Sequence, residues 1–264
     1  MAGVEKGAVL VTGAAKRIGR EIALDLARAG WRVGVHHYTS TADAEEVVAR
    51  IRAEGGVAEP LQANLEREEE VATLVPRACE RLGPLTALVN NASVFEHDDI
   101  HTMTRPSWDR HMETNLRAPL VLSQAFAEQM LKRPPAQSPA EADGCIVNIL
   151  DQRVWNLTPY FLSYTVSKAG LWTLTQTLAL ALAPRIRVNA IGPGPTLRND
   201  RQTEEHFRSQ WESVPLRRGT TPGEICGALR FILSAPALTG QMIALDGGEH
   251  MGWAQPARGF VPKE

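Results

Sequence analysis

Tyr164, Lys168 and Asp151 are three residues whose types and spacing could support proton transfer. Tyr164 and Lys168 lie four positions apart in a segment that reads as the first turns of a helix, so they share one helix face. An unperturbed tyrosine has a pKa of about 10, too high for easy proton exchange at neutral pH. A lysine ammonium nearby stabilises the phenolate and lowers that pKa, which would make Tyr164 a usable acid or base.

Asp151 stands thirteen positions before Tyr164, at the end of an apolar run over 144–150. An ionised carboxylate cannot donate a hydrogen bond to a carbonyl oxygen, and it repels a developing alkoxide. A simple ketone or alcohol is therefore a poor match. A substrate ring nitrogen that must gain a proton is a better one. Asp151 could accept from N–H groups, or pass a proton through Tyr164 while hydride reaches the neighbouring carbon.

Short β-branched runs alternate with helical patterns almost from end to end and must supply the frame for these residues. Strands that alternate with crossover helices predict an α/β protein with a doubly wound, seven-stranded parallel sheet and helices on both faces. No internal repeat or inter-domain linker interrupts the pattern. The strands are expected at 8–12, 31–36, 57–64, 85–91, 144–150, 185–194 and 239–248.

Two segments lengthen the connections between these strands. The Pro-rich stretch 132–144 reads as a loop, and 195–218 lacks a clear period, so we interpret it as a helical flap over the site rather than core. The helices are expected at 17–30, 42–56, 66–83, about 106–131, around Tyr164, and 221–234.

The composition argues against several other functions. The chain has 264 residues, 44% hydrophobic and 22% charged, with a net charge of -2 and a pI near 6.4, which gives no electrostatic footprint for nucleic acid or anionic membrane. No transmembrane helix or signal peptide is expected. Three widely spaced cysteines without a CxxC favour a reducing compartment, with cytoplasm as the default, and no metal site.

The segment "VTGAAKRIG" (11–19) joins the first strand to the first helix. A turn there exposes backbone N–H groups at a helix N-terminus, where phosphate groups bind favourably. Gly13 and Gly19 could also simply make a tight turn, so the loop alone leaves both interpretations open.

With its other motifs, the chain resembles the short-chain dehydrogenase/reductase family over essentially its whole length. Thr12, Gly13 and Gly19 match the family fingerprint T-G-x-x-x-G-x-G, in which Arg17 replaces the middle glycine. The resemblance implies a single-domain Rossmann fold over 1–264, with a cofactor half at about 7–150 and a catalytic helix and substrate flap at about 151–250. The further matches are "NNAS" (90–93), Asn115, Tyr164-x-x-x-Lys168, "GPG" (192–194) and "LDGG" (245–248).

The family binds a nicotinamide dinucleotide, and the resemblance implies which residues hold it. Asn64 and Leu65 stand where the family usually has an Asp and an aliphatic residue beside adenine, and Asn can still hydrogen-bond the base. The other implied cofactor contacts are Gly13, Lys16, Arg17, Ile18, Gly19, Asn91, Ala92, Ser93, Tyr164, Lys168, Pro193, Gly194 and Thr196.

The end of the second strand indicates which cofactor is used. An NAD enzyme usually has Asp or Glu there to hold the ribose 2′-OH. This chain has "VHHYTS" (35–40), with no acid among the six residues. His36, Ser40 and Lys16 could bind a 2′-phosphate by charge and hydrogen bonding, so NADP(H) is favoured over NAD(H). The plainer alternatives are a solvated Lys16 and a His36 that packs at a strand end.

The resemblance also implies catalytic roles. Tyr164 would be the acid or base, Lys168 would hold the nicotinamide ribose, and Asn115 would help to organise a proton-relay water. Most members have Ser at the position of Asp151, where its hydroxyl holds a substrate carbonyl oxygen.

Asp in the serine position resembles one branch, the pteridine reductases and the related dihydromonapterin or alternative dihydrofolate reductases. That branch also has an Arg where this chain has Arg17, and an N-A-S-x-F segment, here "NASVF" (91–95). The resemblance implies that Phe95 stacks over a pterin and sandwiches it against the nicotinamide. It also puts Ser93 near cofactor and pterin, and Arg17 beside the pyrophosphate and the pterin.

The favoured hypothesis is an NADPH-dependent reductase of a pterin or folate C=N bond. Phe95 could instead be a loop anchor, and Arg17 could serve the cofactor alone. Asp151 could be tolerated in a carbonyl reductase, such as a 3-oxoacyl-carrier-protein reductase, that uses Ser163 or another donor.

A non-catalytic NADPH-binding sensor would be expected to lose Tyr164 or Lys168. Two departures from the branch, Thr39 after the second strand and the flap sequence, leave the preferred pterin open.

The helix segment 169–183 is apolar nearly all round, although a helix against one sheet face needs a single apolar stripe. The excess predicts a subunit interface, which fits the family's usual homotetramer. The tail 252–264 could reach a neighbouring subunit, or it could be a frayed terminus.

Overall fold

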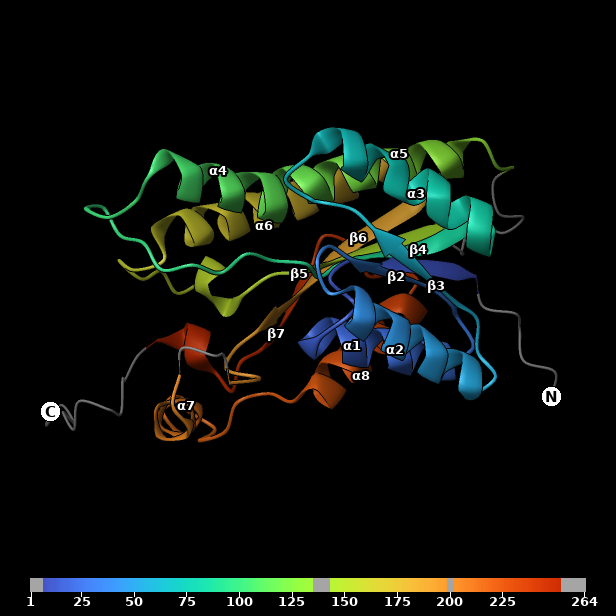
Figure 1. Ribbon diagram of the computed structural model, residues 1–264. Coiled ribbons are helices and arrows are strands. Elements are labelled where there is room, and N and C mark those ends of the chain that lie inside the picture. The colour runs from blue at the N-terminus through green and yellow to red at the C-terminus, as the bar shows by residue number, and fades with distance from the viewer. Residues whose placement is uncertain (1–6, 135–142, 199–201, 253–264) are drawn as a thin grey trace, which may run out of the picture.

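The computed structural model describes residues 7–134, 143–198 and 202–252 of the chain. Within these residues, seven parallel strands form one sheet in the order β3-β2-β1-β4-β5-β6-β7 (Figure 1). The order reverses between β1 and β4, as in the doubly wound sheet that the alternating pattern predicts. The strands are β1 (Ala8–Val11), β2 (Arg32–His37), β3 (Ala58–Gln62), β4 (Leu85–Asn90), β5 (Gly144–Ile149), β6 (Ile186–Pro193) and β7 (Met242–Leu245).

Helices cover both faces of the sheet, which explains why its central strands are continuous apolar runs. One face packs against α1 (Arg17–Arg28), α2 (Thr41–Ala53) and α8 (Pro222–Ser234). The opposite layer contains α3 (Glu68–Leu82), α4 (Arg105–Met112), α5 (Ala118–Leu131) and α6 (Leu162–Leu182).

The region 106–131 differs from the single long helix that its pattern predicts. A π-helical turn, η1 (Glu113–Arg117), separates α4 from α5. Pro119 accounts for the wider turn, because a proline has no N–H for the carbonyl four residues earlier and its ring clashes with that carbonyl. That carbonyl belongs to Asn115, so the irregular turn occurs at a predicted site residue.

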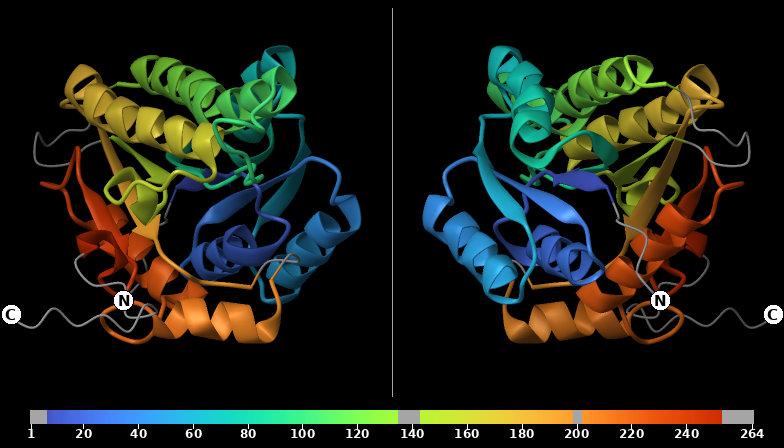
Figure 2. Two further views of the ribbon diagram at one scale, coloured as in Figure 1. Left: turned by 90° about the vertical axis from the view of Figure 1, so that its left-hand side faces the viewer. Right: turned by 90° about the vertical axis from the view of Figure 1, so that its right-hand side faces the viewer.

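The flap expected at 195–218 contains α7 (Glu204–Glu212), which begins where the Thr203 side chain accepts a hydrogen bond from the backbone N–H of His206 at 3.1 Å. Figures 1 and 2 show α7 outside the two helix layers. Six flap residues line the cavity described below: Pro195, Thr196, Leu197, Gln202, Phe207 and Gln210.

Candidate active site

A cavity of about 910 Å³ lies where the strand order reverses, at the carboxyl ends of the central strands. This is the usual ligand position in open α/β sheets. Two predicted site residues, Ser40 and Asn115, do not line it. The structure brings together around it Gly13, Lys16, Arg17, Ile18, Gly19, His36, Asn64, Leu65, Asn91, Ala92, Ser93, Phe95, Asp151, Tyr164, Lys168, Pro193, Gly194 and Thr196.

The loop between β1 and α1 has the features of a phosphate site. Gly13 adopts a left-handed φ of 63°, and a Cβ on Gly19 would lie 2.1 Å from the Gly13 carbonyl oxygen. Lys16 is the N-cap of α1, but its side chain makes no capping hydrogen bond. The first N–H groups of α1 therefore keep their capacity to bind an anion beside the cavity.

Thr12 and Asn91 connect this loop to the end of β4. The Thr12 hydroxyl accepts hydrogen bonds from the backbone N–H groups of Asn91 and Ala92, at 2.9 and 3.0 Å. The Asn91 amide donates to the Thr12 and Gly13 carbonyls at 2.8 and 3.2 Å. These bonds hold the "TG" and "NNAS" motifs against each other.

His36 is buried and does not present a charge to a ligand. Its Nδ1 accepts a hydrogen bond from the Gly13 N–H at 3.0 Å, so its Nε2 carries the proton that faces the Ala63 carbonyl at 3.2 Å. Burial lowers the pKa of His36 to about 4, which leaves the ring neutral at pH 7. We expected a charged His36 to contact a 2′-phosphate. The structure corrects this expectation, because the neutral ring bonds to Gly13 and supports the phosphate loop instead.

Lys16 and Ser40 were the other two residues expected near a 2′-phosphate. Lys16 lines the cavity, and its exposed ammonium forms an ion pair with Asp43 at 3.1 Å. Ser40 is the N-cap of α2 and lies outside the cavity lining. Lys16 is thus the one of these three that offers a charge to the cavity.

Arg17 joins the phosphate loop to the flap. It has a left-handed φ of 53°, the conformation that suits the glycine it replaces. Its guanidinium donates hydrogen bonds to the backbone carbonyls of Leu197 at 3.0 Å and Arg198 at 2.7 Å. Its side chain therefore connects the phosphate loop to the first residues of the flap, and Arg17 also lines the cavity.

Asp151 and Tyr164 form a hydrogen-bonded pair in the cavity. The Tyr164 hydroxyl donates to Asp151 Oδ2 at 2.8 Å, while Oδ1 accepts from the Arg153 backbone N–H at 2.9 Å and caps the 3₁₀ turn η2 (Gln152–Val154). Lys168, one turn after Tyr164, donates to the Ile149 carbonyl at 2.8 Å, with its Nζ 5.8 Å from the Tyr164 ring centroid.

The expectation that Lys168 lowers the pKa of Tyr164 is wrong for this arrangement. Burial and the Asp151 carboxylate together raise the pKa of Tyr164 well above its usual value. Burial lowers the pKa of Lys168 to about 8. Tyr164 is therefore a protonated phenol at neutral pH, suited to donate a proton during a reduction.

Asn115 is fully engaged in positioning backbone. Its Oδ1 accepts from the Val94 N–H at 2.8 Å, and its Nδ2 donates to the Val94 carbonyl at 2.9 Å and to Ser167 Oγ at 3.1 Å. It is completely buried. In this structure Asn115 holds the 93–95 segment against α6, and its predicted part in a water relay remains a prediction.

Phe95 and Phe161 form an aromatic wall of the cavity. Their rings stack with centroids 4.4 Å apart and planes 10° from parallel, and Phe95 meets the Tyr164 ring edge-on at 4.7 Å. The Arg153 guanidinium lies 5.2 and 4.7 Å from the Phe95 and Phe161 centroids. A flat apolar surface thus stands beside the Asp151–Tyr164 pair.

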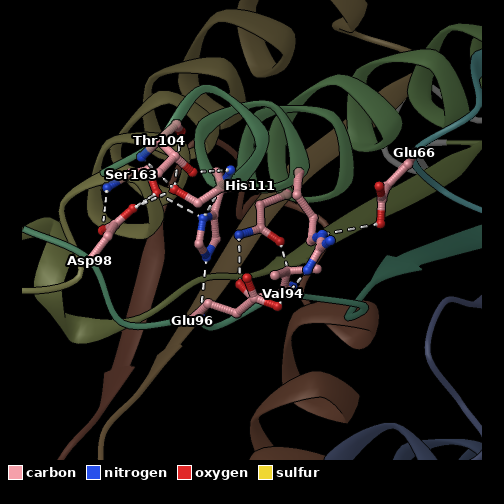
Figure 3. A network of polar contacts seen from close by, with 10 residues as sticks. Glu66, Val94, Glu96, Asp98, Thr104, His111 and Ser163 are labelled. Carbon is pink, nitrogen blue, oxygen red and sulfur yellow. Dashed lines mark hydrogen bonds and ion pairs between the residues drawn. The ribbon is translucent and has the colours of Figure 1, made fainter. Parts of the chain in front are cut away.

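Ser163, the alternative donor, is occupied in a buried network (Figure 3). Its hydroxyl donates to Asp98 and contacts His111 Nδ1 at 2.7 Å, and its backbone N–H also donates to Asp98, at 3.1 Å. Ser163 is completely buried and is not among the cavity-lining residues. It therefore cannot replace Asp151 as a contact to substrate.

The polar residues of the cavity lining that were missed from the sequence are Tyr38, Glu66, His97, Thr114, Gln152, Arg153, Gln202, Gln210 and Glu249. Gln152 and Arg153 follow Asp151 directly, and Glu249 follows the "LDGG" motif in the 3₁₀ turn η3 (Glu249–Met251). Their proximity to recognised motifs was a signal, but the direction of each side chain depends on short 3₁₀ turns. Burial, and next the Asp151 carboxylate, raise the pKa of Glu249 to about 7.

Within residues 7–134, 143–198 and 202–252, no helix is long and apolar enough to cross a membrane. No group of three or more His, Cys, Asp and Glu side chains there is arranged to hold a metal ion.

Comparison with known proteins identifies a matching family, similar reductases in sequence and similar solved structures. The model of the short chain dehydrogenase family matches residues 7–208. The 3-oxoacyl-[acyl-carrier-protein] reductase FabG of Staphylococcus epidermidis is 33% identical over 247 residues, which cover 92% of this chain and 98% of the relative.

Two solved structures are more similar in sequence. FolM alternative dihydrofolate reductase 1 from Brucella canis, complexed with NADP, is 45% identical with a TM-score of 0.88, covering 96% of this chain and 97% of that one. The corresponding Brucella suis protein in complex with NADP is 44% identical with a TM-score of 0.88, covering 97% and 99%.

Proposed function

This chain belongs to the short chain dehydrogenase family, and from that premise we propose that it is an NADPH-dependent reductase of a ring C=N bond in a pterin or folate. The observation that carries the proposal is the hydrogen bond from Tyr164 to Asp151 inside the cavity. The higher identity to the Brucella FolM proteins, 45% against 33% for FabG, supports the same choice.

The residues around the phosphate loop fit a dinucleotide. The uncapped N-terminus of α1 suits the pyrophosphate, and the absence of a Cβ at Gly19 allows the tight loop that Gly13 begins. Lys16 is the charged candidate for the 2′-phosphate, and the Brucella proteins were crystallised with NADP. When bound, the cofactor supplies a hydride to the substrate ring carbon.

Tyr164 then supplies the proton. The C=N π bond breaks as hydride adds to carbon, and its electron pair remains on nitrogen, which becomes strongly basic. The Tyr164 hydroxyl protonates that nitrogen, so new C–H and N–H bonds form while NADPH is oxidised to NADP⁺. A solvent proton then restores the phenol.

Asp151 orients the Tyr164 hydroxyl and accepts hydrogen bonds from the N–H groups of the heterocycle. The flat ring would lie against Phe95, whose contact with Phe161 keeps the aromatic wall in place. Ser93 and Arg17 complete this proposed substrate set, as both line the cavity. The parallel assay described below distinguishes folate, biopterin and monapterin side chains on the ring.

Reduction of a carbonyl is the second candidate, favoured by the FabG relative. Its difficulty is the Asp151 carboxylate, which would lie beside the alkoxide that hydride addition produces. Ser163 offers no alternative contact, because its hydroxyl bonds Asp98.

The deciding experiment measures NADPH oxidation by wild-type protein and Asp151→Ser with four substrates in parallel: dihydromonapterin, dihydrobiopterin, dihydrofolate and an acetoacetyl thioester. We expect turnover of at least one pterin or folate, and a loss of about 100-fold or more in the variant, as for removal of a group that assists proton transfer. Asp109→Ser, which removes an exposed carboxylate on α4, is the matched control and should retain the wild-type rate.

The other outcomes assign the other functions. Turnover of the thioester alone, kept or improved in Asp151→Ser, would identify a carbonyl reductase. Tight NADPH binding without oxidation on any candidate substrate would favour a non-catalytic sensor.

A further inference from the structure

Three polar side chains meet in the cavity without a part in the proton transfer proposed above. Gln152 and Arg153 lie on η2, and Glu249 begins η3, nearly a hundred residues later. The Asn156 amide donates to the Glu249 backbone carbonyl at 3.1 Å and fixes the two turns against each other. The two turns therefore present these three side chains to the same cavity.

Gln152 has a buried side-chain acceptor in the cavity lining. Its side chain is 4% exposed, and its Oε1 finds no hydrogen-bond partner among the described residues. Arg153 Nη1 is also buried and unpartnered within that part of the chain. Buried polar atoms without partners are costly, so both are expected to bond a molecule that enters the cavity.

Glu249 adds a second carboxyl group close to Asp151. A Cβ on Gly194 would lie 3.1 Å from Glu249 Oε2, so this carboxyl group lies against the "GPG" backbone. The charged groups that act on it are Asp151 from the end of β5, Arg153 from η2 and Asp246 from the end of β7. Asp246 is paired with His250 at 2.7 Å.

We propose that Glu249, with Gln152, recognises the amino and N–H groups of a 2-amino-4-oxo heterocycle, and that it is a specificity-determining residue of this site. This inference rests on the proposed function and identifies the amino and N–H groups of the substrate as the groups that the cavity binds. Glu249 and Gln152 accept hydrogen bonds, Arg153 donates to the ring carbonyl, and the Phe95 ring, backed by Phe161, contacts the flat face. A simple ketone has only an acceptor, so it would offer no donor to the Glu249 carboxyl group.

The test compares Glu249→Gln with wild type in binding, not only in turnover. Dihydrobiopterin is titrated into NADP⁺-loaded protein and followed by fluorescence. We expect the Kd to rise about tenfold or more, as for loss of a charge-assisted hydrogen bond, with the Kd of NADPH changed less than about twofold. Glu128→Gln, the same change at an exposed position on α5, is the matched control and should bind as wild type.

A substrate-side change makes the test specific. In the 2,4-dioxo analogue of the pterin, a carbonyl replaces the amino group. Wild-type protein should bind it at least about tenfold more weakly than the amino compound, whereas Glu249→Gln should bind the two alike, because an amide can donate or accept.

The pH dependence gives an independent readout. Because the pKa of Glu249 is raised to about 7, the carboxyl group gains a proton as pH falls from 8 to 6 and loses its charge. Pterin affinity of wild-type protein should therefore fall over that interval. In Glu249→Gln the same interval should show little change, which separates Glu249 from Asp151, Asp246 and His250.

Each other outcome overturns one idea. If Glu249→Gln and Glu249→Ala bind and reduce pterins as wild type does, the role of Glu249 is wrong and the proposed function stands. If both variants lose affinity for the amino and dioxo compounds equally, Glu249 is structural. If wild-type protein neither binds nor reduces any pterin, the proposed function fails first.

Discussion

The Tyr164 hydroxyl is arranged to give up a proton rather than to accept one. It donates to Asp151, and burial beside that carboxylate keeps it protonated at neutral pH. The sequence correctly brought Tyr164, Lys168 and Asp151 together, but it predicted the opposite direction for the Tyr164 pKa. The reason is that a nearby carboxylate and desolvation both act against phenolate, and neither can be weighed without knowing depth of burial.

Replacement of Tyr164 by Phe should therefore remove the proton donor while preserving the aromatic ring. We expect kcat to fall by about 10²- to 10⁴-fold, the usual contribution of a positioned acid, with the Kd of NADPH within about threefold of wild type. Tyr160→Phe is the matched control, because Tyr160 is 55% exposed and does not line the cavity. Unchanged turnover in Tyr164→Phe would mean that another donor supplies the proton.

His36 links the phosphate loop to the pH dependence of stability. Its folded pKa of about 4 lies below the ordinary value of 6.5, so the unfolded chain binds more protons between those pH values. The stability that His36 contributes is therefore present above pH 6.5 and is lost as pH falls toward 4. At pH 5 this loss should be about 2 kcal/mol.

The measurement is the difference in unfolding free energy between pH 7 and pH 5 in denaturant titrations. His36→Asn keeps an acceptor for Gly13 and removes the titrating ring, so this difference should shrink by about 2 kcal/mol relative to wild type. His101→Asn removes an exposed histidine and should leave it unchanged. An equal difference in His36→Asn and wild type would contradict the burial argument.

Among the elements, α6 depends on a residue far outside it. Asp98 caps its N-terminus, where its backbone carbonyl accepts from Phe161 and Leu162 at 2.7 and 3.3 Å and its carboxylate accepts from Ser163. Phe161 takes a left-handed φ of 57° there and stacks on Phe95. One buried carboxylate thus sets both the start of the Tyr164 helix and the aromatic wall.

Asp98→Ala should lower the free energy of unfolding by about 2–4 kcal/mol, because it removes the cap and leaves buried donors of Ser163 unsatisfied. The comparison is Asp109→Ala, which breaks an exposed ion pair with Arg105 and should cost at most about 1 kcal/mol. Chemical denaturation of both variants gives the difference. Equal, small losses would mean that the network in Figure 3 does not hold α6.

For the whole molecule, the sheet and most of the cavity could be predicted because their signals are local. Strand runs alternate with helical patterns, and the loop 11–19 shows its glycines directly. What the sequence missed depends on distant contacts. His36 is neutral because Ala63 and Gly13 enclose it, and η1 exists because Pro119 disturbs the carbonyl of Asn115.

The predicted tetramer, the cytoplasmic location and the role of the tail stay predictions. In α6, Val166 and Leu180 are 44% and 83% exposed, so part of this apolar helix lacks a cover within the described chain. The tail 253–264 lies outside the described residues. Size-exclusion chromatography with light scattering would measure the assembly directly.

The contact between Arg17 and the flap has a consequence for how this protein could diversify. Arg17 holds the flap through the main-chain carbonyls of Leu197 and Arg198, and every amino acid carries a main-chain carbonyl. Substitutions at these flap positions therefore leave the acceptors for Arg17 intact. Such a lineage could explore new substrate side chains by drift in the flap without first rebuilding the attachment that holds it over the cavity.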